Sequence, residues 1–76
     1  MEHLVIIAPK DSVLADTLTQ SCLFRLTCRT ANYAYFAYAG EQSPLRKACQ
    51  ILSSFNFKEF SLDKETNYYR LKVYAE

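Results

Sequence analysis

The segment 24–38 constrains the fold more strongly than any other part of the chain, because it contains two neighbouring stretches in which side chains of different character alternate. Alternation with a period of two is typical of half-buried β-strands, whose successive side chains point to opposite faces of a sheet. The segment therefore predicts a β-hairpin that turns near residues 30–32. On its first strand, we expect the side chains of Phe24, Leu26 and Cys28 to face the core.

Three other segments also have strand patterns. Residues 4–8 form a continuous apolar run rich in β-branched side chains, which is typical of a central strand covered on both faces. Residues 57–62 are expected to form a short strand with Phe60 and Leu62 facing inward. Residues 69–75 alternate between large apolar and polar side chains and predict the last strand.

Two helices are expected between these strands. Apolar residues recur at helical spacing over residues 12–22, and either Asp11 or Ser12 can cap this helix by accepting a hydrogen bond from its first turn. The pair Ser43-Pro44 marks the start of a second helix, because proline at the first helical position has no N–H to leave unpaired. Asn56 is the expected end of that helix, in the left-handed conformation that asparagine tolerates.

The order of these elements is strand, helix, strand, strand, helix, strand, strand. Two right-handed strand–helix–strand crossovers place both helices on the same face of a sheet. The expected fold class is therefore α+β: a ferredoxin-like βαββαβ sandwich with a short extra C-terminal strand, in which two helices cover one face of an antiparallel sheet. Residues 1–76 are expected to form a single domain of this kind.

The composition excludes several kinds of active site. Gly40 is the only glycine, which excludes glycine-rich phosphate-binding loops. His3 is the only histidine and the three cysteines form no Cys-x-x-Cys pair, so neither a catalytic Cys–His pair nor a metal-ligand cluster is expected. Asp11 could hold a metal ion at the end of a central strand, but a helix cap is the simpler explanation. We therefore expect no catalytic activity, no metal and no cofactor.

The cysteines and the apolar segments bear on the cellular compartment. Cys22, Cys28 and Cys49 are odd in number, and we expect them to be buried, reduced thiols. No apolar run approaches the roughly 20 residues that span a membrane. The run at residues 4–8 is too short for a signal peptide and lacks its charged leader. These features predict an intracellular, cytoplasmic protein that does not bind membranes.

The sheet face opposite the helices is the expected location of the function. In the register set by the alternating patterns, this face combines arginine and lysine with tyrosine, and Val5 and Ile7 of the central strand lie between them. Tyrosine and arginine are both enriched among the residues that dominate binding interfaces. The candidate partner-binding residues are Arg25, Arg29, Tyr33, Tyr35, Arg70, Lys72 and Tyr74.

Residues 31–38, with the sequence Ala-Asn-Tyr-Ala-Tyr-Phe-Ala-Tyr, resemble the aromatic octapeptide of the RNA-recognition-motif family. In that family the octapeptide lies on the third strand, and the residues corresponding to Tyr33 and Tyr35 stack on bases. Asn32 stands where the family has a glycine, and Ala31 stands where it has a cation. The resemblance implies a ferredoxin-like fold that binds RNA or single-stranded nucleic acid by stacking bases on the two tyrosines.

Two functions from different classes therefore remain open. The chain contains nine Lys and Arg residues and eight Asp and Glu residues, which gives a net charge of +1. Nucleic-acid-binding domains usually carry a basic excess. This balance favours a small non-enzymatic module that binds a protein partner, as an inhibitor, an antitoxin-like protein or an assembly subunit. Binding of RNA or single-stranded nucleic acid is the alternative, and a homodimer is compatible with a domain of this size.

Overall fold

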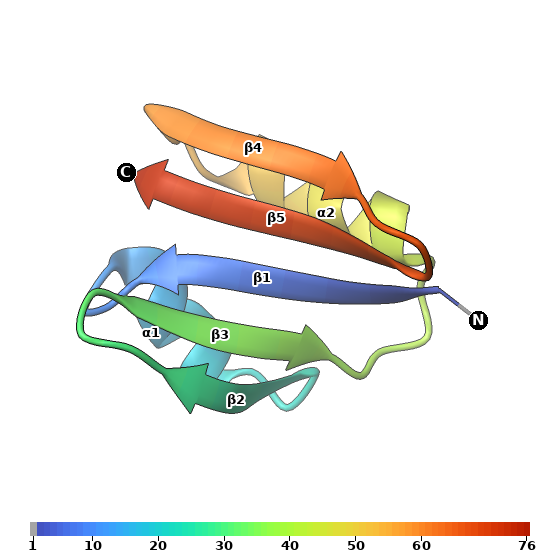
Figure 1. The fold of residues 1–76 in the computed structure, drawn as a ribbon, viewed down its shortest axis with the longest axis horizontal. Helices are drawn as coiled ribbons and strands as arrows, with labels where there is room; N and C mark the ends of the chain where they lie inside the picture. The colour runs from blue at the N-terminus through green and yellow to red at the C-terminus, as the bar shows by residue number, and fades with distance from the viewer. Residues whose placement is uncertain (1) are drawn as a thin grey trace.

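Seven elements follow one another in the order that the sequence predicts, and they form one five-stranded sheet with two helices against one of its faces (Figure 1). The computed structural model describes residues 2–76. The α+β class is therefore confirmed. The elements are β1 (His3–Pro9), α1 (Val13–Gln20), β2 (Phe24–Arg29), β3 (Tyr33–Tyr38), α2 (Pro44–Ser54), β4 (Glu59–Lys64) and β5 (Tyr68–Ala75).

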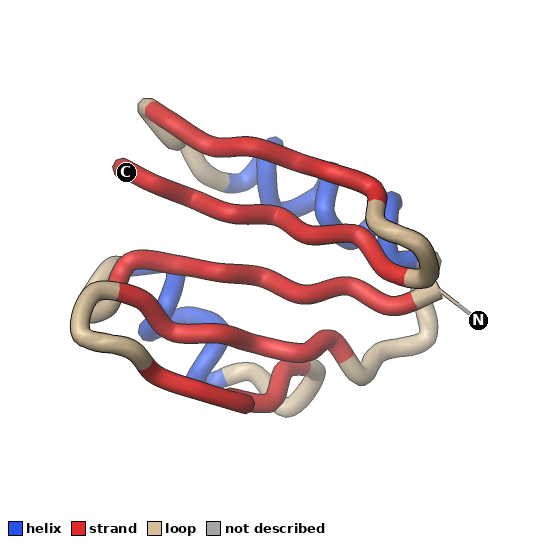
Figure 2. The backbone as a smooth tube through the Cα atoms, viewed as in Figure 1, coloured by secondary structure: helices blue, strands red, loops and turns tan. Residues whose placement is uncertain are grey.

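The strands lie in the order β2-β3-β1-β5-β4, so the apolar run at the start of the chain is central, as expected. The expectation of an antiparallel sheet is wrong at one position, because β1 and β5 are parallel. A single strand after α2 would run parallel to β3 and therefore antiparallel to β1. Here the strand that runs antiparallel to β1 is β4, which lies at the outer edge of the sheet. The β4–β5 hairpin then reverses the direction of the chain (Figure 2).

Both helices begin at the serines that the sequence marks as caps. The hydroxyl of Ser12 accepts a hydrogen bond from the N–H of Ala15, and that of Ser43 accepts one from the N–H of Arg46. The prediction of a left-handed end at Asn56 is wrong, because α2 ends at Ser54 and the next residue, Phe55, is already extended. The Phe55 ring stacks on a second phenylalanine ring beyond the helix, which favours an extended exit over a left-handed turn.

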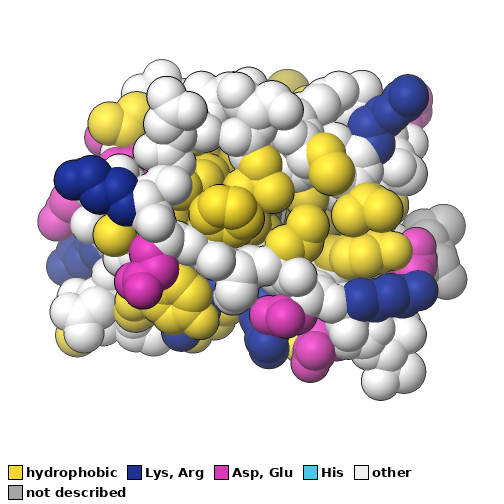
Figure 3. Space-filling model, turned by 90° about the horizontal axis from the view of Figure 1, so that it is seen from above, with side chains coloured by type: hydrophobic (Ala, Val, Ile, Leu, Met, Phe, Trp, Pro, Cys, Tyr) yellow, Lys and Arg dark blue, Asp and Glu magenta, His cyan; other side chains and the backbone are white. Residues whose placement is uncertain are grey.

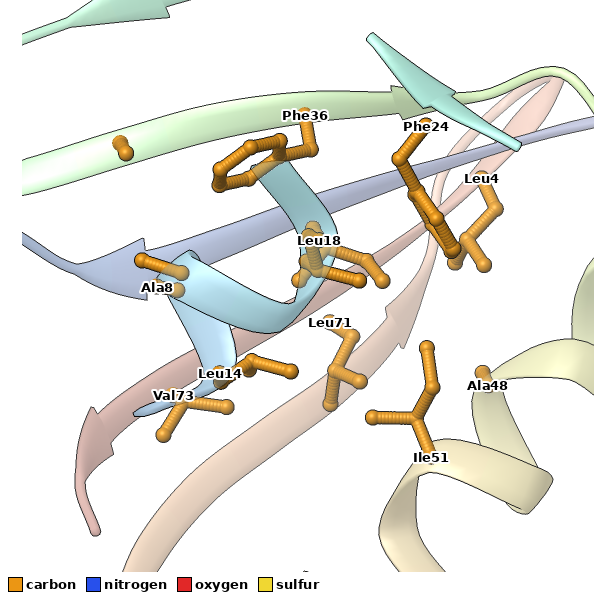
Figure 4. Packing of buried hydrophobic residues seen from close by; sticks show 13 residues of the cluster. Leu4, Ala8, Leu14, Leu18, Phe24, Phe36, Ala48, Ile51, Leu71 and Val73 are labelled. Carbon is orange, nitrogen blue, oxygen red and sulfur yellow. The ribbon is translucent and has the colours of Figure 1, made fainter. Parts of the chain in front are cut away.

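The core lies between the helices and the sheet, where α1 packs on β1 and β2 and α2 packs on β1 and β5. Alternate residues of β1 and β5 supply one layer, and apolar residues of the helices supply the other (Figure 4). Burial of each such large side chain contributes about 1.5–3 kcal/mol. The largest fully buried side chains are Phe36, Leu4, Ile6, Leu14, Leu71 and Val73.

A β-bulge in β2 changes the register that simple alternation predicts. The pairing with β3 shifts between Leu26 and Cys28, so that Cys28 lies opposite Tyr35. An extra residue at a bulge moves every later side chain of the strand to the other face. The expectation of an inward-facing Cys28 is therefore wrong, because Cys28 is exposed on the far face. Leu26 precedes the bulge and pairs with the buried Phe36, so it points to the helix side as expected, although it is 38% exposed at the sheet edge. Cys22 and Cys49 are exposed as well, so none of the three thiols is buried.

Candidate binding face of the sheet

The sheet face that the helices leave uncovered is called the open face below. Directly paired residues of neighbouring strands point to the same face. Since Leu4, Ile6 and Ala8 of β1 point into the core, Val5 and Ile7 point to the open face. Their cross-strand neighbours point there too. The open face defined in this way contains Val5, Ile7, Arg25, Cys28, Tyr33, Tyr35, Tyr68, Arg70, Lys72 and Tyr74.

Six of the seven candidate partner-binding residues lie on the open face, and Arg29 does not. Beyond the bulge, Arg29 pairs with Ala34, whose side chain is buried on the helix side. Arg29 therefore lines a small cavity of about 70 Å³ beside α1, together with Lys10 and Asp16. The residues that the structure brings together are Arg25, Tyr33, Tyr35, Arg70, Lys72 and Tyr74.

The ammonium group of Lys72 lies between two tyrosine rings. Its Nζ atom is 4.9 Å from the centroid of the Tyr33 ring on β3 and 5.0 Å from that of Tyr74, two residues along β5. A cation this close to a ring is attracted by the negative face of the π-system. The two contacts hold the lysine side chain across β1 and fix the relative positions of two aromatic rings on the surface.

Ile7 forms the buried floor of this arrangement. Its Cα partners are Tyr35 on β3 and Lys72 on β5, and its side chain is only 5% exposed although no helix covers it. The long neighbouring side chains therefore remove an isoleucine from water on the open side of the sheet. Burial of Ile7 favours ordered side chains on the open face, because each side chain that covers Ile7 removes apolar surface from water.

Arg70 is the second cation on β5, and its charge is compensated. Its guanidinium lies 3.4 Å from a carboxylate oxygen of Asp63 and 3.8 Å from one of Glu65. The negative charge of Glu65 and the hydrogen bond that Arg70 donates to Asp63 raise the pKa of Arg70, while partial burial opposes that shift. Lys72 therefore carries the less compensated charge at the centre of the face.

A shallow hollow of about 520 Å³ lies over β1 and β5 on the open face. Val5 and Ile7 form its apolar floor, and tyrosine hydroxyls and the two cations form its walls. Tyr68 belongs to this wall and was missed from the sequence. The signal was present, since Tyr68 continues the alternation of Arg70 and Lys72 backward by one step. The hollow offers aromatic rings for stacking, phenol hydroxyls for hydrogen bonding and one central positive charge, that of Lys72.

A larger hollow, of about 640 Å³, lies where the start of β1 meets the loop after β3. Its walls are mostly loop residues, and the ring of Tyr38 there packs on Phe24 at 5.2 Å between centroids. It brings together no pair of cations and no set of aromatic faces comparable with the open face. We therefore regard the open face as the stronger candidate.

Within residues 2–76, no group of three or more His, Cys, Asp or Glu side chains is arranged to hold a metal ion. Neither of the two helices described is long and apolar enough to cross a membrane. Comparison with known proteins returned no match, whether to a family model, to a curated protein or to a solved structure.

Proposed function

We propose that this domain is a non-enzymatic binding module that contacts a protein partner through its open face. The observation that carries the proposal is the position of Lys72 between the rings of Tyr33 and Tyr74, above the buried Ile7. Aromatic and cationic side chains that are already ordered lose little conformational entropy on binding. Tyrosine is also among the residues that most often dominate the binding energy of protein interfaces.

The charge distribution supports a protein partner over a nucleic acid. Affinity for nucleic acid depends on several cations that neutralise phosphates. Arg29 lies on the opposite face, and Arg70 is paired with two carboxylates, so Arg25 and Lys72 supply most of the uncompensated positive charge. A face with tyrosines, an apolar floor and little net charge suits a protein surface better.

The alternative function is binding of RNA or single-stranded nucleic acid by stacking bases on Tyr33 and Tyr35. The adjacency of β3 and β1 supports the likeness to the RNA-recognition motif, as does the order β2-β3-β1-β5, in which β5 takes the place of the last strand of a ferredoxin-like sandwich. Two observations disfavour it: β5 runs parallel to β1, and one face of the Tyr33 ring is occupied by Lys72.

The test uses two variants, a double substitution on the open face and a single substitution on the helix side. Tyr33→Ala with Tyr74→Ala removes both rings that contact Lys72, while Leu45→Ala removes a side chain of α2 that is exposed on the helix side. Wild-type protein and both variants serve as bait in a nuclease-treated lysate. Any captured protein is then identified, purified and titrated by calorimetry. We expect the tyrosine variant to bind at least about tenfold more weakly and the Leu45→Ala variant to bind like wild type.

The two functions separate in a second titration. A fluorescent single-stranded oligonucleotide of mixed sequence is titrated with the domain at two or more salt concentrations. Binding that falls steeply with salt and is lost in the tyrosine variant would establish the nucleic-acid function. If the tyrosine variant binds a purified protein partner as tightly as wild type does, the open face is not the interface and the proposal fails.

A further inference from the structure

The two edges of the sheet differ in how well they could accept another strand. At the β2 edge, the bulge between Leu26 and Cys28 interrupts the row of backbone groups, and two arginines flank it. Bulges and charges are the usual protection of an edge strand. At the β4 edge, the irregularity falls at its start, between Glu59 and Phe60, and the rest of the strand keeps a regular register. The β4 edge is therefore the less protected of the two.

The backbone groups of β4 that point away from the sheet can be assigned from its pairing. The N–H of Glu65 donates to the carbonyl of Tyr68 at 2.8 Å, which makes this a hydrogen-bonded pair. Hydrogen-bonded and non-hydrogen-bonded pairs alternate along an antiparallel ladder. Asp63 and Ser61 therefore also bond to β5. The residues of β4 whose N–H and C=O groups point outward are Phe60, Leu62 and Lys64.

An apolar strip runs beside these outward-facing backbone groups. Phe55 and Phe57 stack with centroids 5.3 Å apart, and Phe57 meets Phe60 edge-on at 6.3 Å. Phe60 is 45% exposed and Leu62 is half-buried, so the strip ends at the edge with apolar surface in water. Figure 3, which views the molecule from the β4 side, shows apolar side chains gathered across the middle of this face with charged groups around them.

We propose that two copies of this chain associate through their β4 edges, antiparallel, with Leu62 opposite Leu62 of the second copy. A two-fold axis perpendicular to the sheet leaves the helices of both copies on the same side. In this register Phe60 faces Lys64 and Ser61 faces Asp63 of the other copy. All three outward-facing residues then pair as hydrogen-bonded pairs, and the two apolar strips meet.

The charges of β4 select this register over its neighbours. Only registers that pair side chains of the same face are possible around such an axis. Centring the axis on Ser61 would place Glu59 opposite Asp63, and centring it on Asp63 would place that carboxylate opposite itself. Like charges directly opposite each other destabilise a strand pair. Centring on Leu62 brings no like charges face to face between the two β4 strands, and Glu59 falls opposite Glu65, which lies in the turn beyond the end of β4.

Lys64 would ordinarily discourage edge pairing, but its charge is compensated within its own chain. Its Nζ atom lies 3.2 Å from a carboxylate oxygen of Glu2 and 5.7 Å from the centroid of the Tyr69 ring. The ammonium is thus held beside Glu2, and the aliphatic stem remains to meet Phe60 of the second copy. This inference uses a surface separate from the open face, so it stands or falls independently of the proposed function.

The first test measures association by sedimentation equilibrium from about 1 μM to about 1 mM protein. Wild-type protein is expected to dimerise within this range. Phe60→Lys should raise the dissociation constant by about tenfold or more, since it places a charge in the strip, directly opposite Lys64 of the second copy. Leu26→Lys is the control, because it also introduces a lysine at a similarly exposed apolar position, on the β2 edge, and should leave association unchanged. Monomeric wild-type protein throughout, or equal effects of the two changes, would overturn the proposal.

The second test reports on the register. The background is a variant in which the exposed Cys22, Cys28 and Cys49 are replaced by serine. In that background Leu62→Cys should form an intermolecular disulfide on mild oxidation, because hydrogen-bonded pairs have Cα atoms about 5.5 Å apart. Asp63→Cys should not, because its own counterpart is a diagonal neighbour at about 7–8 Å. Equal cross-linking of the two variants would contradict the register, and no cross-linking of Leu62→Cys would contradict the interface.

Discussion

The carboxylate of Glu76 accepts a hydrogen bond 3.0 Å long from the backbone N–H of Leu14, in the first turn of α1. Its other oxygen accepts a second bond of 3.0 Å from the N–H of Val13. Ser12 supplies the acceptor for the next free donor, the N–H of Ala15. The residue after β5 thus completes the cap of the first helix, which fixes the end of β5 against the start of α1.

The first prediction concerns this cap. Glu76→Gln keeps the shape of the side chain but removes the negative charge beside the positive end of the helix dipole. We expect it to lower the free energy of unfolding by about 0.5–1 kcal/mol, and Ser12→Ala to lower it by about 1 kcal/mol. Urea unfolding monitored by circular dichroism measures both. Glu59→Gln, at an exposed position in β4, is the control, and an equal loss there would show that the cap contributes nothing specific.

The second prediction concerns Gly40 and the ring of Tyr38. A Cβ atom at residue 40 would overlap that ring, which packs on Phe24. The hydroxyl of Tyr38 also accepts a hydrogen bond from the N–H of Gln42 at 3.2 Å. The φ angle of Gly40 is not in the left-handed region, so the substitution tests steric overlap alone. Gly40→Ala should lower the free energy of unfolding by about 1–3 kcal/mol.

A double-mutant cycle checks that cause. In a Tyr38→Ala background the overlapping ring is gone, so the further change Gly40→Ala should have little effect on stability. Thermal and urea unfolding of the four proteins provide the coupling energy. If Gly40→Ala destabilises both backgrounds equally, the glycine is required for a reason other than the ring of Tyr38.

The order of elements could be predicted from the sequence because each element carries its own local signal. The serine before each helix, the proline after Ser43 and the apolar run at residues 4–8 act within a few residues of where they stand. The direction of β5 could not be predicted in this way. It depends on which of two strands after α2 lies beside β1, and that choice is made by packing over the whole sheet.

The open face was predicted in most of its members and missed at the bulge. Alternation assigns a side chain to a face only while the count of residues on paired strands stays equal. One extra residue near Thr27 breaks the count, and its hydroxyl donates a 3.2 Å hydrogen bond to the carbonyl of Tyr35. Nothing in the residue pattern of β2 marks that position. The error therefore falls on Cys28 and Arg29, which follow the bulge, and spares Arg25, which precedes it.

The third prediction follows from the ion pair of Lys64 with Glu2. The hydrogen bond to Glu2, and then its negative charge, raise the pKa of Lys64. A lysine whose pKa is higher in the folded state contributes stability below its unfolded pKa and loses that contribution as pH rises through the folded value. We therefore expect wild-type protein to be slightly more stable than Glu2→Gln at pH 7, with the difference vanishing in strongly alkaline solution.

Comparing the two proteins at each pH isolates the pair, because other groups that titrate in alkaline solution affect both. Urea unfolding midpoints from neutral to alkaline pH provide the measurement. A difference that stays constant, or grows, as pH rises through the pKa of Lys64 would show that Glu2 stabilises the fold by another route.

The fourth prediction concerns the lysine on the open face. Lys72→Met keeps an apolar stem over Ile7 but removes the ammonium from the rings of Tyr33 and Tyr74. Cation–π contacts at exposed sites contribute about 0.5–1 kcal/mol, so the loss of stability should be of that order. Lys72→Ala also uncovers Ile7 and should destabilise more than Lys72→Met. Equal urea midpoints for the two variants would show that the stem does not protect the isoleucine.

The fifth prediction separates the two arginines of β2, which the alternating pattern places together and the structure places on opposite faces. Arg25 pairs with Ala37 on the open face, whereas Arg29 pairs with Ala34 on the helix side. Arg25→Glu should weaken binding of a partner at the open face by about three- to tenfold, through the loss of one favourable charge and the gain of an unfavourable one. Arg29→Glu makes the same change in charge, four residues along the same strand, and should leave binding close to wild type. Calorimetric titration of both variants against the same partner measures the contrast. A larger effect at Arg29 would place the interface on the helix side, because only an interface there would bring Arg29 nearer than Arg25 to the bound partner.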